Sequence, residues 1–559
     1  MRLRTISGKF SLPAASAIRW RTADLIGAVA FVAILLTLAW RLTQGADFSD
    51  ESYYAIFIDD WLKGGIRSSA LLNLHQTAAL IVYPAARLYT AVIGSHSGLM
   101  LFLRGLYLLG SALAAGCWFA FLRHAGSRGS AWAAAAAALA FIPGGLPAPS
   151  YDTLGLQGLS VGLAAFGAAQ FAETVHARWI WRIVSALGWA AATVAYPSLG
   201  VVLGIFLFAV LVALPVIQTK AWLASVILLQ IAAWAGVVIA LGFGKLYDSV
   251  SYTAAFEADF SRKLQFSAQL FASHKVFAWA CLLATTIGIC RNLIGATRTS
   301  VAIAFLLLLT ISNSPALFAR SSDLILVLAL SGLGLLAGFR PGASPQRRLF
   351  AVLYVTTMSA GIITTLSAFY GLYSFFVGGA PAAILALAEP DGRRPVARLA
   401  ITTRKGLAAA ALLVSSLTYF YGDLPGVTSP RQRIGWGVFA GLALQQDQAA
   451  ILRLMRDQVS PLIAGARTIA EVARYPALIL ATPARPLMPS VFPLTENIRT
   501  VGLALNASYF ASHSADVVLI YIDPHLDVAN PYGPSFPDRY TLVARFTVAS
   551  GILEVFRHK

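Results

Sequence analysis

Hydrophobic residues along this chain are gathered into long runs that short polar segments separate. A helix needs roughly 20 apolar residues to cross a bilayer, because lipid leaves unpaired backbone groups without hydrogen-bond partners. This rule predicts about 13 membrane-spanning helices. They lie near residues 25–42, 99–122, 131–145, 153–172, 179–195, 199–217, 222–243, 276–292, 300–314, 323–339, 349–369, 372–388 and 405–421. The pattern therefore predicts an α-helical multi-pass membrane protein.

Basic residues alternate between the loops that join these spans. With the N-terminus placed in the cytoplasm, the loops on that side hold 20 of the 42 Lys and Arg residues. Lys and Arg gather in cytoplasmic loops, so the alternation predicts this orientation. It also requires that the apolar segment 74–93 lies on the membrane instead of crossing it, and Arg87 within that segment agrees. We expect a bacterial inner (cytoplasmic) membrane protein.

Composition and charge then exclude several classes of protein. Apolar residues make up 58% and charged residues 12% of the chain, whereas soluble proteins carry about 25% charged residues. The net charge of +18 mostly reflects topology, so no nucleic-acid partner is needed. The three cysteines all lie in apolar runs, which argues against disulfides outside the cell. The sequence contains no P-loop, no HExxH zinc motif and no Gly-x-Ser-x-Gly elbow.

Three segments are predicted to lie on the outer side of the membrane. Two are long loops, residues 43–98 and 244–275, and the third is the C-terminal part, residues 422–559. The C-terminal part has a helix-like stretch at 440–459 and strand-like runs at 516–522, 540–548 and 551–556, the last two forming a hairpin. We therefore expect a transmembrane domain over residues 1–421 and a small periplasmic α/β domain after it.

The first outer loop carries the most informative cluster of polar residues. Asp47, Asp50, Glu51 and Tyr54 are spaced so that they would share one face of a helix. Clustered carboxylates repel one another unless a cation, a basic partner or a proton compensates, and such a cluster suits a general base. The alternative is structural: Asp47 or Ser49 caps the helix, and acids in its first turn favour the helix dipole.

The order of these features resembles a known enzyme superfamily. A first span followed by an outer loop that opens with Asp-Glu-x-Tyr-Tyr-Ala (residues 50–55) and runs to Gly64 and Gly65 is similar to the GT-C glycosyltransferases. The branch with the aminoarabinose transferase and the protein O-mannosyltransferases has this shape. The resemblance implies about 11 to 13 spans, two surface helices in the first outer loop and a polyprenyl-phosphate-linked sugar donor. It also implies that Asp50 is the catalytic carboxylate, with Glu51 as the less favoured substitute.

The chain departs from the aminoarabinose branch later in the same loop. That branch has a Lys-Pro-Pro element, whereas the corresponding residues here, 72–77, read Leu-Asn-Leu-His-Gln-Thr. The departure argues against the same substrate. His75 is a candidate for contact with a phosphate or a sugar, although a lone His at a helix start is more often a polar cap.

A departing polyprenyl phosphate needs nearby cations to neutralise its charge. Arg104 lies inside the second span, where an ionisable group is costly and usually paired, so it would hold a loop carboxylate or the phosphate. The candidates for donor-phosphate binding are Arg104, Arg320, Lys63, Arg67, Arg262, Lys263 and His75. Their alternative is anchoring at the membrane interface. Tyr54, Asp47, Tyr151 and Asp152 are expected to line the substrate cavity, unless Asp152 only caps the fourth span.

The leading hypothesis is an integral-membrane glycosyltransferase that moves a sugar from a polyprenyl-phosphate donor to a lipid, glycan or protein acceptor on the periplasmic face. Asp47, Asp50 and Glu51 are also hard oxygen ligands, so a divalent metal is a candidate cofactor. The alternatives are a transporter or flippase for a lipid-linked sugar and a non-catalytic scaffold. Transporters often contain repeated halves, and no internal repeat is found here.

Overall fold

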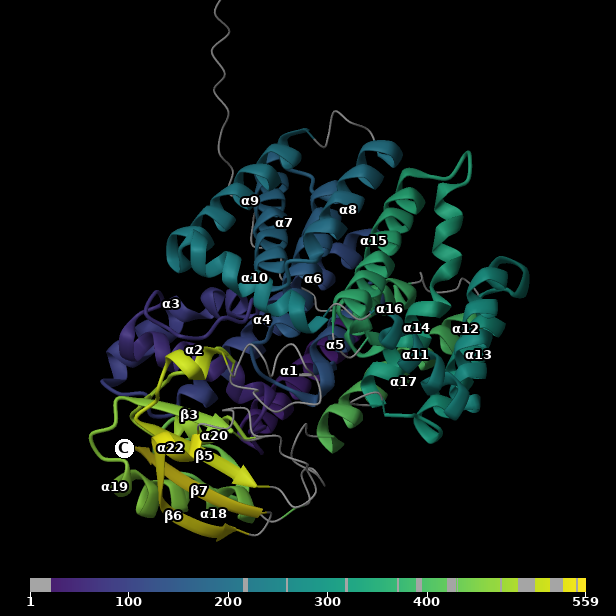
Figure 1. The fold of residues 1–559 in the computed structure, drawn as a ribbon. Helices are drawn as coiled ribbons and strands as arrows, with labels where there is room; N and C mark the ends of the chain where they lie inside the picture. Colours follow the sequence, from purple (N-terminus) through teal and green to yellow (C-terminus); the bar gives the residue numbers. More distant parts are fainter. Residues whose placement is uncertain are drawn as a thin grey trace, which may run out of the picture.

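The computed structural model describes residues 22–214, 220–257, 260–316, 320–368, 371–388, 395–419, 429, 431–472, 475–490, 508–522, 536–548 and 551–559. The larger part is a bundle of helices. A smaller part, built around a β-sheet, lies beneath one end of this bundle (Figure 1). The predicted fold class, a helical membrane protein with a C-terminal α/β domain, is confirmed in outline.

Each predicted apolar run coincides with helical structure. The elements of the bundle are α1 (Thr22–Leu42), α4 (Leu99–Ala125), α5 (Arg128–Ala140), η1 (Pro143–Gly145), α6 (Tyr151–Phe171), α7 (Val175–Ala195), α8 (Leu199–Ala213), α9 (Lys220–Leu241), α12 (Lys275–Ile294), α13 (Ala296–Ser312), α14 (Arg320–Ser331), η3 (Leu333–Phe339), α15 (Pro345–Ser367), η4 (Gly371–Phe375), α16 (Phe376–Leu387) and α17 (Pro395–Thr418). The largest departure is at 131–145, where α5 ends at Ala140 and a Pro-Gly-Gly turn follows.

Length and hydropathy set a lower limit on the number of membrane crossings. Among the described residues, six helices are long and apolar enough to cross a bilayer: Asp24–Leu42, α4, α6, α9, Arg320–Phe339 and α15. The pair Lys263–Ser273 and Lys275–Arg291, bent by 101°, raises the number to seven if it forms one span. Shorter apolar helices cover 199–213, 296–312 and 371–387. The count of 13 spans therefore stays a prediction.

Small residues bring α6 and α7 into close contact. A Cβ on Gly188 would lie 2.5 Å from the backbone N of Gly162 and 2.9 Å from the carbonyl O of Gly158. Helices inside a membrane gain stability from such close backbone approach, because lipid tails give little hydrophobic drive for association. The outward faces of the bundle are apolar: Leu36 on α1, Val212 on α8 and Ile239 on α9 are 65%, 70% and 69% exposed. Side chains of this kind fit contact with lipid.

The two long connecting segments are largely helical. The first contains α2 (Asp50–Gly64), which is mostly buried, and α3 (Gln76–Ile93), which packs against α2, α4 and α7. The second contains α10 (Phe243–Glu257) and α11 (Phe260–Ser273). α10 covers the chain between α2 and α3, because Lys245 Nζ donates to the carbonyls of Ile66 and Ser69 at 3.0 and 2.9 Å.

The C-terminal part contains a mixed five-stranded sheet in the order β4-β3-β5-β7-β6. β3 pairs in parallel with β4 and β5, while β7 pairs antiparallel with β5 and β6. The other elements are a two-stranded ribbon of β1 and β2 and several short helices. Their bounds are β1 (Arg431–Arg433), β2 (Ala443–Gln445), α18 (Gln446–Leu454), η6 (Met455–Val459), α19 (Ser460–Leu462), β3 (Thr468–Val472), α20 (Ala477–Leu480), β4 (Arg485–Pro486), β5 (Val517–Ile522), α22 (Phe536–Arg539), β6 (Tyr540–Val548) and β7 (Gly551–His558).

The predicted strands are confirmed, and the predicted helix is confirmed only in part. The runs at 517–522, 540–548 and 551–558 are strands, and the last two pair as a hairpin from Val548 to Gly551. The helix expected from 440 begins at Gln446, because residues 443–445 pair with β1 instead. Hydrophobic periodicity does not reveal this pairing, because the partner residue of Ala443 in β1 lies ten residues earlier in the chain.

One hydrophobic core joins the C-terminal domain to the first outer segment. Buried side chains of α2 and α3 belong to the same cluster as those of β3, β5 and α20. Polar contacts reinforce it: Arg485 Nε lies 2.7 Å from Asp60 Oδ1, and Lys63 Nζ donates to the carbonyl of Thr482 at 3.0 Å. The sheet domain is therefore docked on α2, immediately beside the predicted acidic site.

Candidate active site

The acidic cluster lies where α1 ends and α2 begins. Asp47 lies before the helix and not on its face, because α2 starts at Asp50. Its Oδ1 accepts hydrogen bonds from the backbone N and the hydroxyl of Ser49 at 3.0 and 2.6 Å, and its Oδ2 accepts one from the backbone N of Glu51 at 2.9 Å. Asp47 therefore satisfies the first amides of α2, the capping role that was the structural alternative. The expectation that it shares a helical face with Asp50 is wrong.

Glu51 is held by the arginine of the second predicted span. Arg104 Nε lies 2.5 Å from Glu51 Oε1, and Arg104 Nη2 lies 2.7 Å from Oε2. Both residues are buried, at 1% and 4% exposure. Arg104 Nη1 also donates to the carbonyls of Leu42 and Gln44, at the end of α1. A bidentate pair with these extra hydrogen bonds fixes α1, α2 and α4 relative to one another.

This arrangement bears on two predicted roles. The Arg104 guanidinium binds a loop carboxylate, which is one of its two predicted functions. Glu51 accepts hydrogen bonds from two Arg104 nitrogens and, at 3.1 Å, from the backbone N of Asp47. Asp50, the first residue of α2, is the neighbour of Glu51 in the chain and is only half-buried. The roles of Glu51 as a catalytic carboxylate and of Arg104 as a phosphate ligand stay predictions.

A second carboxylate of the predicted site lies on α6. Asp152 lies in the first turn of α6, is 7% exposed, and follows a capping box made by Ser150 and Thr153. Burial raises the pKa of Tyr54 well above its usual value, and the charges of Asp152 and Asp50 raise it further. The Tyr54 hydroxyl is therefore within electrostatic range of both carboxylates. Tyr373 of η4 is likewise near Asp152 and Asp50.

The electrostatic environment of the acidic cluster favours the protonated form of Asp47. Burial raises the pKa of Asp47 to about 7, and the neighbouring Asp50 charge adds to the increase, against the hydrogen bonds from Ser49 and Glu51. A carboxyl group with this pKa is partly protonated at neutral pH, which relieves the repulsion among the acids. Asp50 is the more exposed carboxylate of this pair, because it is half-buried whereas Asp47 is buried.

Aromatic rings and a glycine turn form the walls around these carboxylates. The His75 ring stacks on Tyr151 with centroids 3.9 Å apart, and Tyr151 meets Tyr196 edge-on at 4.8 Å. On the other side, Gly144 and Gly145 of η1 have positive φ angles of 60° and 74°. A Cβ on Gly144 would lie 2.2 Å from the Tyr373 hydroxyl, so only glycine allows that ring to cover the turn.

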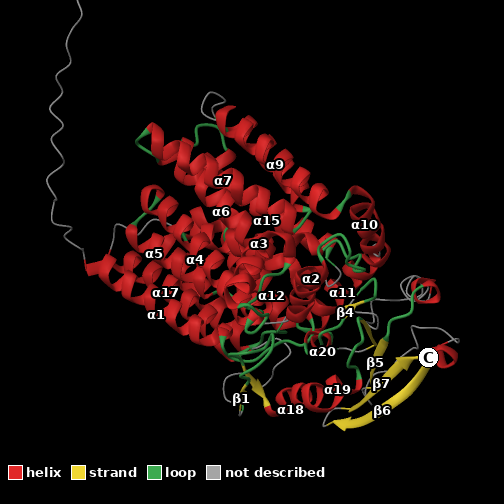
Figure 2. Ribbon diagram, turned by 90° about the vertical axis from the view of Figure 1, so that its left-hand side faces the viewer, coloured by secondary structure: helices red, strands yellow, loops and turns green. Residues whose placement is uncertain are grey.

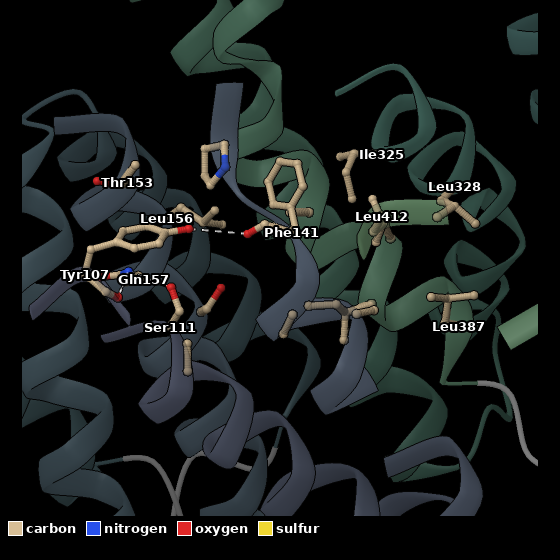
Figure 3. A pocket seen from close by; sticks show the side chains of 18 residues that line it. Tyr107, Ser111, Phe141, Thr153, Leu156, Gln157, Ile325, Leu328, Leu387 and Leu412 are labelled. Atoms are coloured by element: carbon tan, nitrogen blue, oxygen red, sulfur yellow. Dashed lines mark hydrogen bonds between the residues drawn. The ribbon is translucent and has the colours of Figure 1, made fainter. Parts of the chain in front are cut away.

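A small cavity lies in the bundle directly behind the turn. It borders Pro143 beside Gly144 and Thr153 beside Asp152, and its volume is about 30 Å³, enough for a water molecule. Figure 3 shows Tyr107, Ser111 and Gln157 on one side and Ile325, Leu328 and Leu412 on the other. Gln157 Nε2 donates to Ser111 Oγ and to the Tyr107 carbonyl, both at 2.9 Å.

The other predicted cations are distributed away from Asp50. Lys63 lies 2.7 Å from Asp59 and binds the C-terminal domain, and Arg67 donates to the carbonyl of Ile239 at 2.7 Å. Lys263 donates to the carbonyl of Leu366 at 2.8 Å. These contacts tie helices and domains together, so the predicted phosphate role finds no geometric support at these three residues.

Two other arginines predicted to bind the donor phosphate are Arg320 and Arg262. Arg320 is exposed and begins α14, a helix that packs against η1. The side chain of Arg262 lies outside the described residues. His75 stays a candidate for substrate contact, because its stacked ring lies beside Tyr151 and Asp152.

The acidic residues are not arranged as a metal site. Among the described residues, no group of three or more His, Cys, Asp or Glu side chains is placed to hold a metal ion. Glu51 is engaged by Arg104, and Asp47 by the amides of α2, so the proposed set Asp47, Asp50 and Glu51 does not converge.

Sequence reasoning missed several residues of the site. Arg41 is 2% exposed and donates to the carbonyl of Gly145 at 3.1 Å and to that of Gln44 at 3.0 Å, so it fixes the glycine turn against the end of α1. Tyr373 of η4 covers this turn. In the sequence, the Pro-Gly-Gly motif at 143–145 indicates a turn whose backbone can be approached closely by a ring such as that of Tyr373.

No protein-family model matches the sequence, and no curated protein is significantly similar to it. Solved structures do match. The oligosaccharyltransferase of Archaeoglobus fulgidus, in the apo form, is similar with a TM-score of 0.50 and 11% identity, over 89% of this chain and 69% of that one. The chain shares the fold of that protein.

Two further solved structures match over nearly the whole chain. ArnT from Cupriavidus metallidurans, an aminoarabinose transferase, matches in the apo state with a TM-score of 0.43 and 13% identity, over 96% of this chain and 98% of that one. The same enzyme bound to undecaprenyl phosphate matches with a TM-score of 0.41 and 13% identity, over 94% and 97% of the two chains.

Proposed function

We propose that this protein is an integral-membrane glycosyltransferase that transfers a sugar from a polyprenyl-phosphate donor to an acceptor hydroxyl or amine. The proposal rests on one observation above all: Asp50 of α2 and Asp152 of α6 both act electrostatically on buried Tyr54, beside the buried Arg104–Glu51 pair that fixes the start of α2. The shared fold supports this assignment, because the structurally similar proteins are an oligosaccharyltransferase and an aminoarabinose transferase bound to undecaprenyl phosphate.

The position of the carboxylates suits a donor that is embedded in lipid. Asp50 lies eight residues after the end of α1, and Asp152 is the second residue of α6. Both α1 and α6 are long and apolar enough to span a bilayer. A polyprenyl-phosphate sugar carries its reacting atoms at the membrane surface, at the same level as these helix ends. The 30 Å³ cavity behind the site is large enough for a water molecule but too small for an isoprenoid chain, so the carrier would approach from the lipid-facing side of the bundle.

In the proposed reaction, Asp50 accepts the proton of the acceptor as its oxygen or nitrogen attacks the anomeric carbon of the donor. The bond between that carbon and the phosphate oxygen breaks, and polyprenyl phosphate leaves with the electron pair. Asp152 orients the acceptor by hydrogen bonding. The Arg104–Glu51 pair holds the first turn of α2 in place, so that Asp50 meets the reacting atoms without reorganisation. Arg320 and His75 are the candidate contacts for the leaving phosphate.

The test uses the full chain in lipid nanodiscs with a panel of undecaprenyl-phosphate sugars. A bacterial membrane extract serves as the acceptor pool. We expect free undecaprenyl phosphate to appear, together with an acceptor heavier by one sugar, both followed by mass spectrometry. Movement of intact donor across vesicles without either product would instead identify a flippase, and the proposal would be wrong.

A further inference from the structure

Arginine and tryptophan side chains gather on the ribbon and helix that open the C-terminal domain. Arg433 is exposed at the end of β1, and Arg453 and Arg456 are exposed one turn apart at the end of α18 and the start of η6. The guanidinium of Arg456 lies over the half-buried Trp436 ring, 4.6 Å from its centroid. Arg453 also donates to Gln432 of β1. We call Arg433, Trp436, Arg453 and Arg456 the β1–α18 patch.

This patch lies beside the ends of two candidate membrane spans. The backbone beside it is hydrogen-bonded to the end of α1, where the amide of Ala443 donates to the carbonyl of Thr43 at 2.8 Å. It is also bonded to the start of α4, where the amides of Gly98 and Met100 donate to the carbonyls of Gly437 and Val438 at 3.0 and 3.2 Å. Both α1 and α4 meet the length and hydropathy of a membrane span.

An exposed tryptophan lies near the patch. Trp40, in the last turn of α1, is 49% exposed and lies three residues before Thr43. Figure 2 shows β1 and α18 beneath the helical bundle, on the side where α1 ends. Tryptophan rings are enriched at the ends of membrane spans, at the level of the headgroups. We therefore infer that the β1–α18 patch lies at headgroup depth.

Its chemistry fits an anionic headgroup. Arginine presents planar N–H pairs that match two phosphate oxygens, and tryptophan suits the boundary between headgroup and acyl chain. Two acids lie nearby: Asp457 pairs with Arg456 at 2.5 Å, and Asp447 is exposed at the start of α18. Arg456 keeps the pKa of Asp457 below its usual value, so that acid neutralises part of the charge. Arg433 and Arg453 supply the rest of the positive surface.

We propose that the β1–α18 patch binds anionic phospholipid headgroups of the leaflet next to the C-terminal domain, and so holds that domain against the membrane. The inference does not depend on the proposed glycosyl transfer, because it uses none of the site residues. Each arginine near an anionic surface strengthens binding about fivefold at low salt. Removing three should weaken it on the order of 100-fold.

The experiment measures protection of the full chain by phosphatidylglycerol in neutral detergent. The midpoint of thermal unfolding is followed as phosphatidylglycerol is titrated, with phosphatidylcholine as the uncharged reference. The test variant is R433Q/R453Q/R456Q. The matched control, R467Q/R557Q/K559Q, removes the same charge from exposed residues elsewhere in the domain. Other basic loops contribute a background that both variants share.

We expect the control to keep the wild-type titration and the patch variant to need far more lipid, with a weaker dependence on salt. Equal titrations for the two variants would overturn the proposal, whether both keep or both lose the protection. Trp436→Leu, which leaves every charge in place, should also weaken the lipid effect, and it serves if the triple variant folds poorly. If soluble glycerol phosphate protects as well as phosphatidylglycerol, the patch binds a free anion and the lipid assignment is wrong.

Discussion

The buried Arg104–Glu51 pair gives the sharpest prediction on the architecture of the site. Replacing Arg104 with Met leaves Glu51 in a buried position without its two guanidinium contacts of 2.5 and 2.7 Å. It also removes a donor from the carbonyls of Leu42 and Gln44. Breaking one partner of a buried pair costs about 3–5 kcal/mol, since a charge remains uncompensated. We expect a loss of that size in the free energy of unfolding.

The double variant distinguishes an ion pair from two independent contributions. Glu51→Met alone should also be costly, because Arg104 then keeps a buried charge. The variant with both changes should lose about 2 kcal/mol less than the sum of the two single losses, since no buried charge is left. The assay is unfolding in mixed micelles as the denaturing detergent is raised, followed by the fluorescence of the 12 tryptophans.

A control variant separates the pair from general effects of losing an arginine. Arg87 is exposed on α3, so Arg87→Met should change the free energy of unfolding by less than about 0.5 kcal/mol. If the losses of Arg104→Met and Glu51→Met add within about 0.5 kcal/mol, the two side chains are not coupled. That result would refute the positioning role assigned to both residues.

Three further changes test other parts of the structure. Burial raises the pKa of Asp47 to about 7, so its neutral form favours the folded state. This contribution to the free energy of unfolding is lost as the pH rises through 7. Asp47→Asn should therefore reduce the fall in the free energy of unfolding that is measured from pH 5 to pH 8. Glu471 is fully buried in β3 with a pKa raised well above its usual value by burial; Glu471→Gln should therefore raise the unfolding temperature at pH 8 by a few degrees, at about 2–4 °C per kcal/mol, and leave it unchanged at pH 4. Gly188→Ala places a Cβ 2.5 Å from the backbone of Gly162 and should cost about 1–3 kcal/mol in the micelle assay, whereas Gly200→Ala, in open space, should not.

Much of the helical architecture could be predicted because apolar length is a local property. Each run that the membrane rule selected coincides with helical structure, and the strand at 517–522 follows from its β-branched residues. The number of crossings could not be settled in the same way. A 15-residue helix such as α8 is apolar throughout but shorter than a full span, so its sequence does not say how deep it lies.

The site was predicted less completely, because its geometry depends on distant partners. The sequence predicts both Asp50 and Asp152 as site residues, but their common electrostatic effect on Tyr54 depends on the tertiary fold. Arg104 was expected to bind a carboxylate or a phosphate, and the partner proved to be Glu51. Lys63 could not be assigned, because its acceptors are backbone carbonyls of Thr482 and Ala484, more than 400 residues away.

The most direct test of the central proposal separates donor binding from turnover in Asp50 variants. Asp50→Asn keeps the size of the side chain and removes its charge, while Asp248→Asn makes the same change at an exposed position of α10. The account predicts that Asp50→Asn binds the undecaprenyl-phosphate sugar as tightly as the wild type does, but releases undecaprenyl phosphate at least 100-fold more slowly, the lower end of a general-base contribution of about 10²–10⁴. Asp248→Asn should match the wild type in both. Unchanged sugar transfer by a well-folded Asp50→Asn variant would contradict the account.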